Sequence, residues 1–341
     1  MKKLRVAING AGRIGRAFYK LARKRDDMQV VAMNDLGDIN NIAYLLKYDS
    51  AYGVSPFEVS VKGTSIMVDD DEIVMLSEKD PAALPWGDMD IDVVIESTGV
   101  FTKFETASAH ITAGAKRVVI SAPAKDDPKD ETSATVLMGI NEEKLQTCIV
   151  SSNASCTTNA GSPLMAILNE TVGIEKAILN TIHGYTASQV IVDGPSRKDF
   201  REGRAGAQNI IPSTTGAAIA VTKALPELVG KFDGISTRVP VIVGSLVDIT
   251  FIAKRDTTAD EIREILTMAS KEKRWQGIFT VSSDPLVSSD IKGNTHASIA
   301  DLEFVRVVDG NLVKVMAWYD NEMGYTNALL EHTALLGSYI D

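Results

Sequence analysis

The sequence predicts an α/β protein in which an N-terminal Rossmann dinucleotide-binding domain is joined to an α+β catalytic domain built on a mostly antiparallel sheet. Three observations support this fold class. The chain opens with a strand, a glycine loop and a helix, and apolar strands then alternate with helices up to about residue 155. Beyond residue 156, long stretches alternate apolar and polar residues. The first pattern is typical of parallel sheets covered on both faces, and the second of antiparallel sheets.

The first domain repeats an alternation of short apolar runs and amphipathic stretches. Strands are predicted at residues 4–9, 29–34, 93–96, 117–121 and 149–152. Helices are predicted at residues 16–25, 40–47 and 106–113. The C-terminal helical stretch, 321–340, is assigned to the same domain. The predicted boundaries are therefore 1–155 plus 321–341 for the Rossmann domain and 156–320 for the catalytic domain.

The second domain is predicted from alternating stretches at 177–186, 234–254 and 302–319. The last of these is interrupted by Asp309-Gly310, a strong hairpin signal. A helix over 258–271 opens with an acidic first turn and a hydroxyl cap. Between the stretches, residues 190–212 form a long segment without a period, and loops of this length are usually functional or lie at interfaces.

Length and composition limit the possible functions. A chain of 341 residues is too long for one ordinary core and favours two domains. No apolar run approaches the ~18–20 residues of a membrane span, and the N-terminus does not fit a signal peptide, so a cytoplasmic protein is expected. Two cysteines provide neither a disulfide framework nor a metal quartet, and no metal is predicted. The net charge of −10 argues against nucleic-acid binding but permits an anionic small substrate.

A dinucleotide fingerprint follows the first strand. Gly10, Gly12 and Gly15 have the spacing GxGxxG, and the second strand leads to Asp35 about twenty residues later. The glycines allow the backbone to approach a pyrophosphate at a helix N-terminus. Asp35 can accept hydrogen bonds from ribose hydroxyls and would repel a 2′-phosphate, which favours NAD over NADP. The alternatives are an ordinary glycine turn and an Asp35 that only caps the helix beginning near residue 38.

The strongest candidate nucleophile is Cys156, which lies among hydroxyl and amide side chains directly before a helical stretch at 160–168. A helix N-terminus lowers the pKa of a thiol, and the thiolate is the reactive form. The other cysteine, Cys148, lies in an apolar segment and is expected to be a small buried residue. An inert structural thiol is the alternative for Cys156.

A thiol nucleophile needs a base, and the chain has four histidines. His183 ends a strand-like run and precedes a polar segment, so it is the first choice for the base. His110 and His332 lie in helical patterns and are expected at the surface, whereas His296 is expected in a loop.

Two segments have the composition of anion sites. Residues 213–218 place hydroxyls and a glycine at the start of a helical run, which suits a phosphate. Arg238 lies in a strand-like stretch, where a buried arginine needs an anionic partner. An internal ion pair is the alternative for Arg238.

Motifs of a recognisable kind are distributed over nearly the whole chain: INGAGRIGR, LLKYDSAYG, STGVF, SNASCTTN, HGYTASQ, QNIIPSTTGAA, RVP and WYDNEMGYTN. With these motifs the sequence resembles the phosphorylating glyceraldehyde-3-phosphate dehydrogenase family. The cysteine octet and the phosphate-site segment are highly specific, whereas the glycine motif alone is not.

The resemblance implies an NAD-dependent oxidative phosphorylation of D-glyceraldehyde 3-phosphate to 1,3-bisphosphoglycerate. Cys156 would attack the aldehyde, and His183 would hold the thiolate and take the hydroxyl proton as hydride leaves. Inorganic phosphate would then cleave the resulting thioester. The substrate phosphate would lie near Thr186 and Arg238.

Further site residues are also implied only by the resemblance. The attacking phosphate would lie near Ser155, Thr157, Thr215 and Gly216, with an arginine that is either Arg201 or Arg204. The implied NAD residues, together with the glycine motif, are Gly10, Gly12, Arg13, Ile14, Gly15, Asp35, Lys79, Ser121 and Asn321. Residues 190–212 resemble a loop that lines the cofactor site of a neighbouring subunit, which implies a homotetramer.

The chain departs from the family pattern at Ala11, Ala160 and Met323, where phenylalanine, a second cysteine and tryptophan are common. None of these changes removes a reacting group. The nearest rival enzyme is erythrose-4-phosphate dehydrogenase, which shares the octet but differs in the phosphate-binding segment. Aspartate-semialdehyde dehydrogenase has a different cysteine neighbourhood. A non-catalytic binding protein is the remaining alternative, although Cys156, His183 and Arg238 are all retained.

Overall fold

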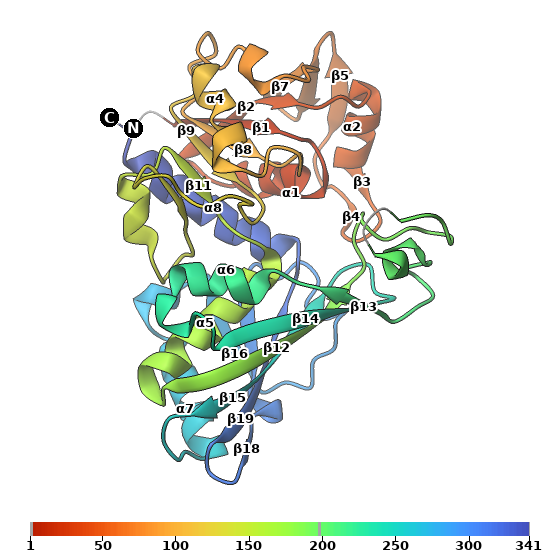
Figure 1. Cartoon of the computed structure of the whole chain (residues 1–341). Helices are drawn as coiled ribbons and strands as arrows, with labels where there is room; N and C mark the ends of the chain where they lie inside the picture. Colours follow the sequence, from red (N-terminus) through yellow and green to blue (C-terminus); the bar gives the residue numbers. More distant parts are fainter. Residues whose placement is uncertain (1–2, 197–198, 341) are drawn as a thin grey trace. The chain divides into compact units, whose positions relative to one another are not determined.

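A computed structural model describes residues 3–196 and 199–340 of the chain (Figure 1). The chain divides into two compact units. One contains the chain up to Ala154 together with the segment from Thr326 onward, and the other is Ser155–Tyr325. The sequence-based boundaries, after residues 155 and 320, lie one and five residues from these divisions after 154 and 325.

The N-terminal unit is built on a nine-stranded sheet with the order β10-β11-β9-β8-β1-β2-β7-β6-β5. Its strands are β1 (Leu4–Asn9), β2 (Met28–Asn34), β5 (Val59–Lys62), β6 (Ser65–Val68), β7 (Asp71–Leu76), β8 (Val93–Glu96), β9 (Arg117–Ile120), β10 (Ser133–Thr135) and β11 (Val150–Ser152). Neighbours run parallel from β10 to β7 and antiparallel at the β7-β6-β5 edge. The chain passes from β1 to β2 on one side and later to β8 on the other, so a topological switch point lies at the end of β1, where such sheets bind ligands.

Helices and short ribbons complete this unit. The helices are α1 (Arg13–Ala22), α2 (Ile39–Lys47), α3 (Phe104–Ala107), α4 (Ala109–Thr112) and, from Thr326 onward, the C-terminal α8 (Met323–Ser338), with 3₁₀ turns at Pro81–Ala83 and Glu142–Gln146. A separate two-stranded ribbon pairs β3 (Tyr48–Asp49) with β4 (Gly53–Val54). The predicted helix at 106–113 is two short helices, and β5, β6, β7 and β10 were not predicted. These missed strands have three to six residues and no long apolar run.

The C-terminal unit is built on a mostly antiparallel sheet with the order β13-β14-β12-β15-β19-β17-β16, to which β18 adds by pairing with β19. Its strands are β12 (Ile174–Gly184), β13 (Ile211–Thr214), β14 (Phe232–Val239), β15 (Ser245–Ala253), β16 (Phe279–Ser282), β17 (Ser298–Asp301), β18 (Arg306–Val308) and β19 (Leu312–Tyr319). Among the strand pairs that the structure describes in this unit, only β12–β14 and β16–β17 are parallel. Together the two sheets confirm the predicted fold class.

The helices of the C-terminal unit are α5 (Cys156–Thr171), α6 (Ala217–Ala224) and α7 (Ala259–Ala269), with 3₁₀ turns at Phe200–Gly203, Pro226–Leu228, Lys273–Trp275 and Leu302–Phe304. Most of α5 is buried, and a Cβ at its Gly161 would lie 3.3 Å from a methyl group of Leu179 on β12. Because Gly161 has no side chain, α5 can pack close to the sheet at this point. The start of α5 is therefore held in a fixed place relative to the ends of β12 and β14.

Two sequence-based expectations about histidines are wrong. His110 and His332 are completely buried rather than at the surface. A helical pattern alone does not show which face packs against a sheet, and both histidines lie on the packed face. Burial lowers the pKa of His332 to about 3, and its Nε2 lies 2.7 Å from Ser151 Oγ. His296 lies in a loop, as predicted.

Among the described residues, no helix has both the length and the apolar character needed to cross a bilayer.

Candidate active site

A nucleotide-sized pocket of about 450 Å³ lies in the N-terminal unit where β1, β2 and β8 end. Its lining residues are Asn9, Gly10, Gly12, Asn34, Asp35, Leu36, Glu78, Lys79, Ser97, Thr98, Val100 and Phe101. Four of them, Gly10, Gly12, Asp35 and Lys79, were predicted as cofactor residues. The pocket lies at the topological switch point, where a doubly wound sheet binds dinucleotides.

The glycine loop has the geometry that the fingerprint predicts. Gly10 has φ +102°, and a Cβ there would come within 2.7 Å of the backbone at Ser97 and Thr98. A Cβ on Gly15 would meet the carbonyl oxygen of Gly10 at 2.1 Å. Gly12 caps α1 without a side chain, and the space beside it is open. The loop and the helix N-terminus therefore fit a pyrophosphate that contacts the backbone closely.

Asp35 lines the pocket and does not cap α2. Its carboxylate accepts hydrogen bonds from the backbone N–H groups of Ala11 and Gly37, both at 2.8 Å. The cap of α2 is Asp38, which accepts from two backbone N–H groups of the first turn. The alternative in which Asp35 only caps a helix is therefore wrong.

The remaining predicted cofactor residues are less closely grouped. Arg13 and Ile14 begin α1, and Arg13 forms an ion pair with Asp49 at 2.8 Å. Ser121 follows β9 at the same edge of the sheet, but it does not line the pocket. Asn321 belongs to the C-terminal unit, where its Oδ1 accepts from Gly244 N at 3.0 Å.

Eight further residues that line the pocket were not predicted from the sequence: Asn9, Asn34, Leu36, Glu78, Ser97, Thr98, Val100 and Phe101. Most of these residues lie at or just after the carboxyl ends of β1, β2, β7 and β8. That position was the available signal, because ligands bind outside the carboxyl ends of parallel strands.

Replacing Asp35 with asparagine is expected to relax the preference for NAD over NADP. The substitution removes one negative charge beside the expected position of a 2′-phosphate, so the ratio of kcat/KM values should shift toward NADP by about tenfold or more. Asp38→Asn is the matched control, because it removes the same charge three residues away from a side chain outside the pocket. An Asp35→Asn enzyme with the wild-type preference would contradict this role.

In the C-terminal unit, Cys156 is the first residue of α5 and faces His183 from the end of β12. The distance from Cys156 Sγ to His183 Nε2 is 3.3 Å. Ser155 caps the helix, since its Oγ accepts from Thr158 N at 3.1 Å. Ala154, immediately before the cap, has φ +54°, an uncommon conformation for a non-glycine residue. The tight turn between β11 and α5 thus places the thiol at the helix N-terminus.

His183 is positioned from the neighbouring strand. In the parallel pairing of β12 with β14, His183 lies opposite Arg238. His183 Nδ1 lies 2.6 Å from the carbonyl oxygen of Gly184 and 2.7 Å from Arg238 Nη1. A carbonyl only accepts and a guanidinium only donates, so Nδ1 can serve one of them at a time. When Nδ1 donates to Gly184, Nε2 carries the lone pair and can receive the proton of Cys156.

Burial determines the protonation of this pair. Burial, assisted by the Arg238 cation, lowers the pKa of His183 to about 3, so the ring is neutral at physiological pH. Burial also raises the pKa of the Cys156 thiol, while Arg238 and hydrogen bonds from Thr157 act in the opposite direction. The lowered thiol pKa expected from the helix start is therefore wrong. A neutral thiol instead lies beside a neutral base that can take its proton.

Tyr319 lies beside the Cys156–His183 pair and was not predicted from the sequence as a site residue. Its hydroxyl lies 2.9 Å from Thr157 Oγ1 and 2.7 Å from Thr181 Oγ1. Its ring meets the His183 ring edge to face, with 5.9 Å between centroids. Tyr319 is buried, and burial raises the pKa of its phenol. It therefore packs against the base and links α5, β12 and β19.

The predicted anion-binding residues fall into separate groups. Thr186 follows β12, and its Oγ1 lies 3.1 Å from Ser188 Oγ. Gly216 is the N-cap of α6, and Thr215 Oγ1 accepts from Ala217 N at 3.2 Å. Arg201 and Arg204 are both largely exposed, and they pair with Asp199 and Asp193. Nothing in this geometry favours one arginine over the other as a phosphate ligand.

Comparisons with known proteins cover both units. Residues 4–104 match the description "Glyceraldehyde 3-phosphate dehydrogenase, NAD binding domain", and residues 155–321 match "Glyceraldehyde 3-phosphate dehydrogenase, C-terminal domain". The chain is 46% identical over 340 residues to glyceraldehyde-3-phosphate dehydrogenase 2 of Streptomyces avermitilis, covering 99% of each chain. It is 45% identical over 337 residues to the enzyme of Geobacillus stearothermophilus, covering 98% of each.

A eukaryotic relative is equally similar. The identity to glyceraldehyde-3-phosphate dehydrogenase 3 of Saccharomyces cerevisiae is 46% over 336 residues, covering 97% of this chain and 99% of the relative. The matched NAD-binding domain confirms NAD as the cofactor, and the pocket and glycine loop of the N-terminal unit fit it. The two domain matches and the full-length identities show that this chain belongs to the glyceraldehyde-3-phosphate dehydrogenase family.

Proposed function

We propose that this protein catalyses the NAD-dependent oxidative phosphorylation of D-glyceraldehyde 3-phosphate to 1,3-bisphosphoglycerate in the cytoplasm. The observation that carries the proposal is the Cys156–His183 pair, with 3.3 Å between Sγ and Nε2 and Arg238 beside the imidazole. A thiol next to a neutral base is the arrangement that covalent catalysis on an aldehyde requires.

The first step forms a hemithioacetal. The sulfur of Cys156 attacks the aldehyde carbon while His183 Nε2 takes the thiol proton and returns it to the carbonyl oxygen. The raised pKa of the Cys156 thiol does not prevent this step, because the proton is transferred over a short distance within the pair. Thr157, next to Cys156, forms a hydrogen bond with Tyr319, whose ring packs against His183.

The second step oxidises the hemithioacetal to a thioester. His183 removes the hydroxyl proton as the hydrogen on carbon leaves with its electron pair. Bound NAD supplies the acceptor for this hydride. Inorganic phosphate then attacks the thioester carbon, the C–S bond breaks, and the acyl phosphate departs while the thiolate is regenerated. In these steps the thiol–imidazole pair supplies the nucleophile and the base, NAD would accept the hydride, and inorganic phosphate would displace the thiolate.

Arg238 is proposed to couple substrate binding to the base. A substrate phosphate bound by Arg238 and Thr186 would draw the guanidinium away from His183 Nδ1. That nitrogen could then donate to the carbonyl of Gly184, 2.6 Å away, which leaves Nε2 as the proton acceptor. For the attacking phosphate we propose Ser155, Thr157, Thr215 and Gly216, with Arg201 or Arg204.

Phosphate dependence tests this function directly. Turnover of glyceraldehyde 3-phosphate with NAD is expected to stop after about one acyl group per active site when inorganic phosphate is omitted, because the thioester is then cleaved only slowly by water. Erythrose 4-phosphate is the comparison substrate. Phosphate-independent turnover, or a higher kcat/KM for erythrose 4-phosphate, would contradict the proposal.

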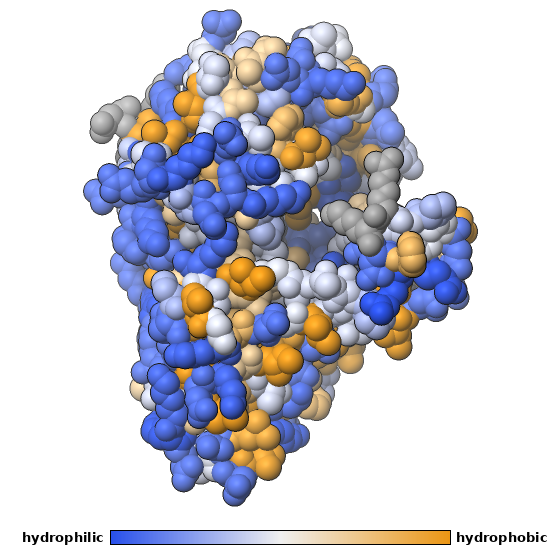
Figure 2. All heavy atoms as spheres, viewed as in Figure 1, coloured by the Kyte–Doolittle hydropathy of each residue, from blue (hydrophilic) through white to orange (hydrophobic). Residues whose placement is uncertain are grey.

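We also propose that the protein is a homotetramer. Apolar side chains at Ile191, Val192, Phe200 and Ile210 are between 71% and 88% exposed in the segment before β13. Apolar side chains also lie over β12 and β14 in Figure 2, where Ile178 and Ile235 are more than half exposed. Exposed apolar groups of this size favour burial in an interface. Light scattering that gave the mass of a monomer at micromolar concentration would contradict the tetramer.

A further inference from the structure

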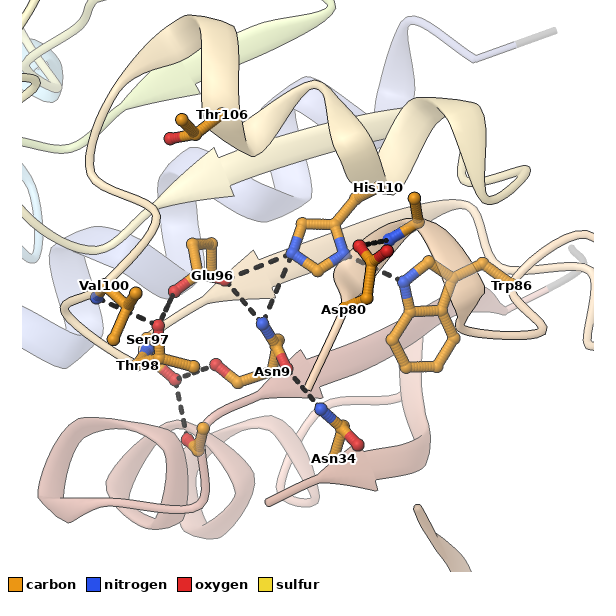
Figure 3. Close-up of polar contacts among 12 residues, drawn as sticks. Asn9, Asn34, Asp80, Trp86, Glu96, Ser97, Thr98, Val100, Thr106 and His110 are labelled. Atoms are coloured by element: carbon orange, nitrogen blue, oxygen red, sulfur yellow. Dashed lines mark hydrogen bonds and ion pairs between the residues drawn. The ribbon is translucent and has the colours of Figure 1, made fainter. Parts of the chain in front are cut away.

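Glu96 carries a completely buried carboxylate, and Figure 3 shows it between Asn9, His110 and Thr98, of which Asn9 and Thr98 line the nucleotide pocket. It is the last residue of β8 and does not itself line the pocket, whereas the next two residues, Ser97 and Thr98, do. Among the described residues, no lysine or arginine pairs with this carboxylate. A buried charge of this kind is retained only where hydrogen bonds satisfy it.

Four hydrogen bonds converge on Glu96. Oε2 accepts from Asn9 Nδ2 at 2.6 Å and lies 3.1 Å from His110 Nε2. Oε1 accepts from the backbone N–H of Thr98 at 2.9 Å and from its hydroxyl at 2.5 Å. Oε2 therefore faces the donors of Asn9 and His110, and Oε1 faces the two donors of Thr98.

The direction of each bond is determined by the chemistry of the partners. Trp86 Nε1, which can only donate, lies 3.0 Å from His110 Nδ1. His110 Nδ1 must then accept, so the ring proton is on Nε2 and points to Glu96. Asn9 must likewise turn its NH₂ to the carboxylate, because its Oδ1 accepts from Asn34 Nδ2 at 2.7 Å. Trp86 therefore donates to His110 and Asn34 to Asn9, and His110 and Asn9 in turn donate to the Glu96 carboxylate.

This network reaches the pocket wall at two places. On one side, Asn34 exchanges two hydrogen bonds with the backbone of Glu78, at 2.8 and 2.9 Å. On the other side, Thr98 Oγ1 accepts from Val100 N at 3.0 Å, which shapes the turn after β8. Asn9, Asn34, Glu78, Thr98 and Val100 all line the pocket. Glu96 is the point where the two walls are joined.

We propose that Glu96 is a positioning residue for NAD, whose buried carboxylate holds the Asn9–Asn34 wall and the Thr98 turn at the spacing that the cofactor requires. Glu96 touches no cofactor atom in this role and acts through Asn9 and Thr98. The inference rests on the NAD-binding domain and not on the proposed reaction.

Glu96→Gln tests this role with little change of shape. One acceptor oxygen becomes an NH₂ group, which must face either Asn9 and His110 or the N–H of Thr98, all of them donors. Titration of the full-length ligand-free protein with NAD is expected to give a Kd raised about tenfold or more, the effect of losing one hydrogen bond to a charged group. KM for glyceraldehyde 3-phosphate and kcat at saturating NAD should change little. The titration requires no aldehyde, so its outcome is independent of the proposed reaction.

Trp86→Phe is the matched control. It removes a buried donor at the outer end of the same network, from a residue that does not line the pocket. It is expected to lower Tm while leaving the Kd for NAD within about threefold of wild type. If Glu96→Gln lowers Tm as Trp86→Phe does but binds NAD like wild type, Glu96 has only a structural role and the proposal is overturned.

Glu96→Asp gives a second test if the glutamine variant does not fold. It keeps the charge but shortens the side chain by one methylene, so the carboxylate can no longer reach both Asn9 and Thr98. A weakened affinity for NAD in this folded variant supports the proposal. Unchanged affinity for NAD would again overturn it.

Discussion

Cys156→Ser is expected to lower kcat by about four orders of magnitude or more, because a serine hydroxyl is a far weaker nucleophile at neutral pH and the thioester cannot form. The Kd for NAD should remain near the wild-type value, since Cys156 lies in the C-terminal unit and the nucleotide pocket is formed by the N-terminal unit. Initial rates with NAD and phosphate, together with an NAD titration, check both expectations.

The second cysteine is the matched control for this variant. Cys148 is buried, and burial raises the pKa of its thiol to about 11, so it should not react with iodoacetamide near pH 8. Wild type and Cys148→Ala should each be alkylated once with loss of activity, whereas Cys156→Ser should not be alkylated. Near-native turnover by Cys156→Ser would exclude the covalent mechanism.

His183→Asn is expected to lower kcat by about 10²–10⁴-fold, the usual contribution of a positioned general base. KM for the aldehyde should change much less, because the lost interaction acts mainly during proton transfer. The rate of Cys156 alkylation should fall as well, since the thiol then has no imidazole within 3.3 Å to take its proton. Steady-state kinetics and timed alkylation measure these effects separately.

The pH profile follows from the direction of the His183 pKa shift. The folded-state pKa is lowered from 6.5 to about 3, so the ring stays neutral as the pH falls through the ordinary histidine range. The rate of the wild-type enzyme is therefore not expected to fall near pH 6.5 through protonation of His183.

His296→Asn is the control for His183→Asn, because this loop histidine has Asn294 as its side-chain partner and lies outside the site. A His183→Asn enzyme as active as His296→Asn would remove His183 from the mechanism.

The local features of the cofactor site were predictable from sequence because they depend on spacing along the chain. The glycines at 10, 12 and 15 must follow a strand and open a helix, and the structure places them there. Asp35 follows the second strand for the same reason. The Glu96 network was not predictable, because its members come from β1, β2, β8 and α4 and meet only when the sheet is ordered β8-β1-β2.

The proposed catalytic pair was likewise only partly predictable from the sequence. The residue types around Cys156 and His183 identified both side chains, and the resemblance assigned their roles. The pairing of β12 with β14, which sets Arg238 against His183, depends on strand register. The contact of Tyr319 with Thr157 also joins residues that are 162 positions apart in the chain.

By itself, the sequence determined the fold class and the dinucleotide fingerprint, and it nominated the candidate thiol and base, because each depends on residue type or short spacing. The tertiary structure decided which histidines are buried, which direction the pKa of Cys156 shifts, and which side chains support the cofactor pocket. The physical reason is desolvation. The removal of water from His110, Glu96 and His183 results from packing between distant strands and helices, and no local pattern of residues records it.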